Sequence, residues 1–336
     1  MAIESQPKEA STEDAHPAGS TDVLAVQRLA TEIRESVQRV IVGKSEAIDL
    51  AVVALLCRGH VLLEDVPGTG KTTLAKALAA SLDCQFGRIQ FTPDLVPADV
   101  LGVNFYNMSK SEFEFRPGPV FSQVLLADEI NRATPRTQSA LLEAMQERQV
   151  SIDGVTSELP EPFMVMATLN PVEMEGTFPL PEAQLDRFMV RASLGYPERE
   201  EESSMLDRFK AGEYPDAIRP VATAGDILSA RKSVDGVRVD DTVRDYLLDI
   251  IAKTRSSASL RLGASPRASL ALQHAAQGRA AMNGRSYVLP DDVKELAVPV
   301  LAHRLLAETT TQLRGQATAE IVREIIESTP VPIERE

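Results

Sequence analysis

The sequence predicts an α/β fold, in which a parallel β-sheet carries helices on both faces, followed by an all-α domain. Short apolar runs that are typical of buried strands alternate with helical patterns as far as Pro197. A small-residue turn follows one of these runs, and two adjacent carboxylates follow another. Before Pro197, the segment from Pro179 to Phe188 is expected to form a helix. Beyond Pro197 the chain shows helical patterns, Pro266 to Met282 among them, and no convincing strand.

The first apolar run, Val61 to Leu63, leads through a turn into a helical pattern. Backbone N–H groups in such a turn point inward, and with a helix N-terminus they form an anion site. Lys71 would bring its ammonium to the outer phosphates of a nucleotide, and the Thr72 hydroxyl would bind Mg²⁺. The nucleotide-binding residues predicted here are Pro67, Gly68, Thr69, Gly70, Lys71, Thr72 and Thr73.

One position departs from the usual phosphate-loop pattern. That pattern opens with a glycine separated by four residues from the final Gly-Lys pair, and Asp65 stands in its place. Pro67 and Gly68 can still form the turn, so we interpret the segment as a variant loop. The alternative interpretation is an ordinary glycine-rich turn between a strand and a helix, with a surface lysine.

The second informative run, Val124 to Ala127, ends in Asp128 and Glu129. It is apolar on both faces, as a central parallel strand is. Asp128 is predicted to hold Mg²⁺, directly or through water, and Glu129 to orient and activate the attacking water. The alternative is a strand end with two solvated acids. A phosphate cradle followed by such a strand is typical of a nucleoside triphosphatase.

Length and composition limit the classes of protein. With 336 residues we expect two domains plus linkers. A net charge of −14 argues against a protein whose whole surface binds nucleic acid. The only cysteines are Cys57 and Cys84, without a CxxC pair, which argues against disulfides and zinc and favours the cytoplasm. No apolar run is long enough to insert in a membrane, and residues 1–20 are expected to form a disordered acidic tail.

The segments described so far, together with others further along, resemble AAA+ ATPases, and within that superfamily the MoxR family. The segments that carry the resemblance are Glu64 to Ala79, Gly118 to Val150, Ala167 to Pro171, Phe178 to Phe188 and Ser265 to Ala268. The resemblance implies an ATPase core over 21–197 and a helical lid over 198–330. It also implies a helix-2 insertion at about 92–118 and a hairpin before sensor 1 at about 150–161.

The resemblance assigns further roles. Asn170 resembles sensor 1, which positions the attacking water, and its alternative is a residue of an Asn-Pro turn. Arg187 resembles an arginine finger delivered to a neighbouring subunit's nucleotide. Arg267 resembles sensor 2, reaching from the lid to the phosphates. Both arginines could instead be solvated. Val42 and Gly43 resemble the segment that contacts the adenine base, although such a pair is also ordinary at a helix break.

The resemblance also implies a function. It points to a Mg²⁺-dependent ATP hydrolase that forms a ring, most simply a hexamer, and that remodels or activates client proteins. A partner with a von Willebrand factor A domain is implied as well. Two alternatives remain open, namely the motor subunit of a metal chelatase and a DNA-acting AAA+ motor. The acidic balance of the chain speaks against stable nucleic acid binding.

Overall fold

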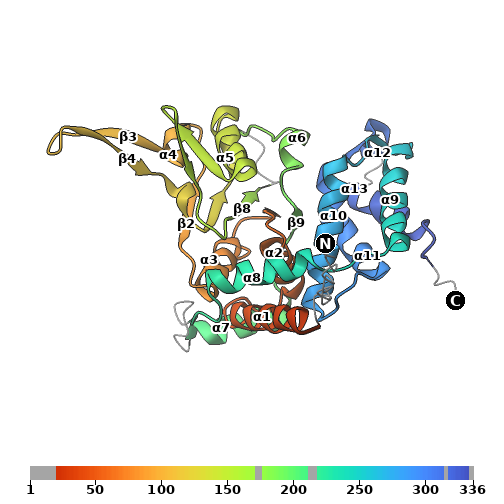
Figure 1. Cartoon of the computed structure of the whole chain (residues 1–336). Coiled ribbons are helices and arrows are strands. Elements are labelled where there is room, and N and C mark those ends of the chain that lie inside the picture. Colours follow the sequence, from red (N-terminus) through yellow and green to blue (C-terminus); the bar gives the residue numbers. More distant parts are fainter. Residues whose placement is uncertain (1–19, 171–175, 211–217, 314–316, 333–336) are drawn as a thin grey trace, which may run out of the picture.

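The computed structural model describes residues 20–170, 176–210, 218–313 and 317–332. Most of the tail expected over residues 1–20 therefore lies outside the described residues, and Ser20 opens the first helix. A sheet between two layers of helices makes up one part of the molecule, and a group of helices lies to one side of it (Figure 1).

The central sheet has five parallel strands in the order β2-β5-β8-β1-β9. The apolar residues of β5 and β8 are buried except for the half-buried Leu169, because each of these strands lies between two others. The predicted parallel sheet is confirmed. Its strands are β1 (Val61–Glu64), β2 (Phe86–Gln90), β5 (Val124–Asp128), β8 (Met164–Leu169) and β9 (Val190–Ala192).

Helices cover both faces of this sheet, as predicted. Successive residues of a strand point to opposite faces, so Leu125 and Leu126 belong to different apolar clusters. The cluster of Leu125 includes α5, and the cluster of Leu126 includes α1, α2 and α3. The bounds of these helices are α1 (Ser20–Gln38), α2 (Ser45–Leu56), α3 (Lys71–Ser81) and α5 (Pro135–Glu147).

The two predicted excursions from the sheet both contain antiparallel hairpins. The longer one, β3 with β4, extends away from the rest of the molecule (Figure 1). Asn104 of this hairpin donates a hydrogen bond of 2.8 Å to Asp153 in the turn of the other, β6 with β7. The elements are α4 (Pro97–Leu101), β3 (Gly102–Asn107), β4 (Glu112–Pro117), β6 (Gln149–Ile152) and β7 (Val155–Glu158).

The described C-terminal part of the chain is mainly helical, but it also contains a strand pair that the sequence did not predict. A short antiparallel pair, β10 (Leu260–Leu262) with β11 (Leu306–Ala307), links two of its loops. The helices are α7 (Arg199–Lys210), α8 (Ala224–Asp235), α9 (Asp241–Ser256), α10 (Pro266–Met282), α11 (Pro290–Leu301), α12 (Thr309–Leu313) and α13 (Thr318–Glu327).

Among the helices after Pro197, α8 packs on helices of the core as well as on α10. In the core, α8 packs on both α1 and α2, and it runs beside α1 (Figure 1). The buried Arg231 of α8 donates its Nε to the Leu55 carbonyl of α2, 3.0 Å away. The chain therefore crosses the core before it forms the group of α9 to α13.

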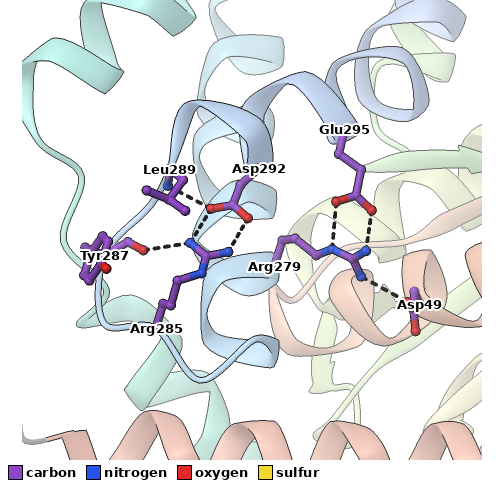
Figure 2. A network of polar contacts seen from close by, with 7 residues as sticks. All are labelled: Asp49, Arg279, Arg285, Tyr287, Leu289, Asp292 and Glu295. Atoms are coloured by element: carbon purple, nitrogen blue, oxygen red, sulfur yellow. Dashed lines mark hydrogen bonds and ion pairs between the residues drawn. The ribbon is translucent and has the colours of Figure 1, made fainter. Parts of the chain in front are cut away.

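An ion-pair network joins that group to the core. Arg279 of α10 donates one nitrogen to Asp49 of α2 at 3.0 Å, and its other nitrogens pair with Glu295 of α11 (Figure 2). Arg34 of α1 binds the second oxygen of Asp49. One largely buried guanidinium thus connects helices of both parts.

Candidate functional site

The phosphate loop lies between β1 and α3, where the sequence predicted it. Gly68 and Gly70 have φ angles of +83° and +95°, in the left-handed region that glycine adopts at little cost. Gly70 is the N-cap of α3, so this helix opens directly from the loop. The loop borders a cavity of about 390 Å³. Of the predicted binding residues, those lining the cavity are Pro67, Gly68, Gly70, Lys71, Thr72 and Thr73.

The side chains of the loop are held by the loop itself. The Nζ atom of Lys71 donates to the carbonyls of Asp65 and Val66, at 3.0 and 2.7 Å. Burial lowers the pKa of Lys71, although the nearby carboxylates of Asp65, Asp128 and Glu129 oppose that shift. Thr69 does not line the cavity, and its hydroxyl donates to the Val66 carbonyl at 3.3 Å.

Asp65, the departure from the usual pattern, has a structural role. Its carboxylate is buried and accepts backbone hydrogen bonds from Leu194 at 2.6 Å and Gly195 at 2.8 Å. Its other oxygen accepts from the Val66 N–H at 3.1 Å. A glycine could make none of these side-chain contacts. Asp65 therefore ties the start of the phosphate loop to the chain that leaves β9.

The predicted carboxylates end β5 and line the same cavity. One oxygen of Asp128 accepts from the Thr168 hydroxyl at 2.7 Å, and the other pairs with Arg88 at 2.7 Å. Glu129 has a φ of +56°, and its N–H donates to the oxygen of Thr168 at 2.7 Å. Thr168 at the end of β8 thus fixes the positions of both acidic residues.

Two residues of β2 take part that the sequence had not indicated. Arg88 and Gln90 point to the same face of β2, which pairs with β5 in parallel register. Gln90 donates to Glu129 at 2.9 Å, just as Arg88 binds Asp128. Glu129 also pairs with Arg132, three residues further on, at 2.9 Å. Only the strand register could have indicated these partners, and it is not visible in the sequence.

The oxygen ligands that line this cavity fit a nucleotide with a bound Mg²⁺ ion. The Thr72 hydroxyl and the Asp128 carboxylate line one cavity, and these are oxygen ligands of the kind that Mg²⁺ uses. Within the described ranges no group of three or more His, Cys, Asp or Glu side chains could hold a metal ion without help. The remaining ligands would be phosphate oxygens and waters, as is usual for Mg²⁺ at nucleotides.

Asn170 also reaches this cavity. It follows β8, its side chain is almost fully buried, and it lines the cavity together with Asp128 and Glu129. The segment of Val42 and Gly43 does not line it, but Ile41 lies 4.0 Å from where a Cβ on Gly70 would be.

The segment after α1 is also packed tightly against α7. Gly43 has a φ of +68°, and a Cβ there would come within 1.7 Å of a Glu201 oxygen. Lys44 donates to the Tyr196 carbonyl at 2.8 Å and pairs with Glu201 at 3.2 Å. Both contacts hold the start of α7 over the segment that includes Val42.

Neither Arg187 nor Arg267 lines the cavity of its own chain. The expected helix over 179–188 is only α6 (Glu182–Leu185), and the chain then turns at Asp186 toward α10. Ser265, the N-cap of α10, donates its hydroxyl to Asp186, and Arg267 lies 3.9 Å from the same carboxylate. Arg267 does not line the cavity of its own chain, and its reach to the phosphates of a bound nucleotide stays a prediction.

No helix within the described ranges is both long enough and apolar enough to cross a membrane.

Comparisons with known proteins agree with this geometry. Residues 60–190 match the family described as "ATPase family associated with various cellular activities (AAA)", and residues 252–325 match the AAA lid domain. A solved structure from Cytophaga hutchinsonii, named there as a candidate ATPase, is similar with a TM-score of 0.87 and 37% identity. The similarity covers 93% of this chain and 98% of that one.

Similar curated proteins cover nearly the whole chain. An uncharacterized protein of Bacillus subtilis, YeaC, is 49% identical over 90% of this chain and 94% of its own. Chaperone MoxR1 of Mycobacterium tuberculosis is 43% identical over 92% of this chain and 84% of its own. Protein MoxR of Paracoccus denitrificans is 32% identical over 87% of this chain and 93% of its own.

Proposed function

Because this chain belongs to the MoxR family of AAA+ ATPases, we propose that it hydrolyses Mg²⁺-bound ATP in a ring of subunits and uses the energy to remodel or activate client proteins. The observation that supports hydrolysis most directly is the shared cavity. It brings the phosphate loop, Asp128, Glu129 and Asn170 together from three neighbouring strand ends.

The residues predicted to bind and hydrolyse ATP have roles that their positions in the cavity support. The Lys71 ammonium moves from the loop carbonyls to the outer phosphates, and the loop N–H groups bind the phosphates between them. Thr72 and Asp128 hold Mg²⁺, which neutralises developing charge on the phosphates when it is bound. Glu129 takes the proton of the attacking water, which Asn170 helps to orient.

A neighbouring subunit completes this site. Arg187 and Arg267 lie outside their own chain's cavity, beside Asp186, so a ring in which the Asp186 side of one subunit faces the next cavity would supply both cations. Contacts of this head-to-tail kind close into rings where the rotation between subunits permits. We propose a hexamer, in which Arg187 stabilises charge in the transition state.

The name of the Mycobacterium tuberculosis relative, a chaperone, supports client remodelling in place of nucleic acid translocation. We propose that the ring works in the cytoplasm with a partner that carries a von Willebrand factor A domain.

The experiment that tests hydrolysis compares Glu129→Gln with the wild type. We expect Glu129→Gln to bind ATP normally and to release phosphate roughly 10²- to 10⁴-fold more slowly, because a general base is lost. Glu143→Gln, an exposed carboxylate on α5, is the matched control and should hydrolyse ATP at the normal rate. Normal turnover by Glu129→Gln would remove the proposed role of this carboxylate.

A further inference from the structure

The short turn that presents Arg187 is held by the lid. The Phe188 carbonyl accepts a hydrogen bond of 2.6 Å from Nη2 of Arg304, and it lies 3.0 Å from Nε2 of His303. Arg304 and His303 follow α11 and are only 5% and 6% exposed. Residues more than a hundred positions away therefore fix the backbone immediately after Arg187.

The residue before Arg187 is held by the same guanidinium. Nη1 of Arg304 lies 3.5 Å from one oxygen of Asp186, and the Ser265 hydroxyl donates to the same carboxylate at 3.1 and 3.2 Å. Arg304 thus contacts both neighbours of Arg187 in the chain. Between α6 and β9 only four residues connect the two elements, so these contacts restrict the whole turn.

We propose that Arg304 is a positioning residue, which holds Arg187 at the place where it enters the neighbouring subunit's ATP site. This proposal rests on the proposed function, because it requires that Arg187 act in trans. As a consequence, the lid of each subunit controls ATP hydrolysis in the site of the neighbouring subunit, through the turn of residues 186–188. When the lid shifts against the core, the contacts to Asp186 and Phe188 shift with it.

The burial of Arg304 supports a role beyond packing. A buried guanidinium is costly to desolvate, and an apolar side chain often packs as well in the same space. Burial lowers the pKa of Arg304 to about 10, while the Asp186 carboxylate opposes the shift, so the group stays charged at neutral pH. A charged guanidinium at this place can bind the Asp186 carboxylate and the Phe188 carbonyl at the same time.

Rings assembled from two different variants test the proposal. They separate a defect in a subunit's own ATP site from a defect in the position of Arg187. Glu129→Gln subunits have a defective site and an intact turn, whereas Arg304→Met subunits have an intact site and a loosened turn. Each alone should hydrolyse ATP slowly. Mixed in equal amounts, they should recover about a quarter of the wild-type rate, since about one interface in four joins an intact site to an intact turn.

Binding measurements accompany the mixing experiment. Arg304→Met should bind ATP with wild-type affinity and form rings of wild-type mass, because its own cavity is unchanged. Asp186→Asn is the second variant, which is isosteric and removes only the charge, and it should complement Glu129→Gln in the same way. Lys71→Ala is the control for a defect in the site itself, and it should not complement Glu129→Gln.

The outcomes separate the two proposals. If Arg187→Ala complements Glu129→Gln but Arg304→Met and Asp186→Asn, folded and able to bind ATP, do not, then Arg304 does not position the finger. Wild-type hydrolysis by either of these two variants alone would also overturn the proposal. If Arg187→Ala itself fails to complement, the site is not shared between subunits, and the proposed function is wrong on this point.

Discussion

Asp128 is bound on both oxygens in this structure, and its partners differ in kind. Thr168 is a neutral donor that also orients Glu129, so it can remain when a metal ion binds. Arg88 is a cation, and its guanidinium lies 2.7 Å from the carboxylate that is expected to face Mg²⁺. A cation of the chain and a cation of the substrate therefore compete for one acid.

This competition gives a prediction for Arg88→Gln. Since the side chain of Arg88 is 47% exposed, its ion pair contributes little energy, and its loss should tighten metal binding only about two- to fivefold. The affinity for Mn²⁺ can be measured by electron paramagnetic resonance on the ATP complex, in the non-hydrolysing Glu129→Gln background. Arg116→Gln, an exposed arginine of β4, is the control. Weaker Mn²⁺ binding by Arg88→Gln would show that Arg88 assists the metal and does not compete with it.

At the scale of elements, the phosphate loop and the carboxylates of β5 could be predicted because each lies within one short segment. A buried strand followed by small residues, or by acids, shows its character in sequence order. The partners of these residues could not be predicted in the same way. Arg88 and Gln90 reach Asp128 and Glu129 only through the register of β2 with β5.

Contacts between residues far apart in the sequence explain where the other predicted elements differ from the structure. The helix expected over 179–188 ends at Leu185, because the backbone at Phe188 is held by Arg304 and His303 of the lid. The position of α8 on the core depends on Arg231, whose partner Leu55 lies far away in the chain. The start of α10 at Pro266 could be predicted, since Ser265 and Pro266 are local signals for the start of a helix.

Arg279 joins three helices in Figure 2, so we expect its replacement to lower the stability of the fold. Arg279→Ala should lower the free energy of unfolding by about 1–3 kcal/mol, because Asp49 and Glu295 would lose a largely buried partner. Urea denaturation would measure this loss. Arg244→Ala, which breaks an exposed pair with Asp241 on α9, should change the same free energy by less than about 0.5 kcal/mol. Equal effects of the two variants would argue against a junction held by Arg279.

At the scale of the whole molecule, two buried histidines make folding sensitive to acid. Burial lowers the pKa of His60 and of His303 to about 3. His60 donates to the Met145 carbonyl from Nε2 and accepts from the Val165 N–H at Nδ1, so its neutral form is bound on both sides. The folded chain therefore keeps both rings uncharged at neutral pH.

The sign of the resulting pH dependence follows from these shifts. In the unfolded chain a histidine titrates near 6.5, so below that pH the unfolded chain binds protons that the folded chain does not. The free energy of unfolding should thus fall as pH falls from about 6.5 toward 3, by up to roughly 1.4 kcal/mol per pH unit for each histidine. Urea unfolding between pH 7.5 and 5 should show this slope, and His60→Asn should reduce it. An unchanged slope in His60→Asn would contradict the assignment.

The central claim concerns the assembled molecule, namely that each ATP site is completed by the next subunit. Its most direct test is the rate of ATP hydrolysis per subunit as a function of protein concentration, with the mass of the particle determined at each concentration. The account predicts a rate per subunit that rises as rings form and then reaches a plateau. A rate that is constant with concentration, from a particle with the mass of one chain, would contradict it.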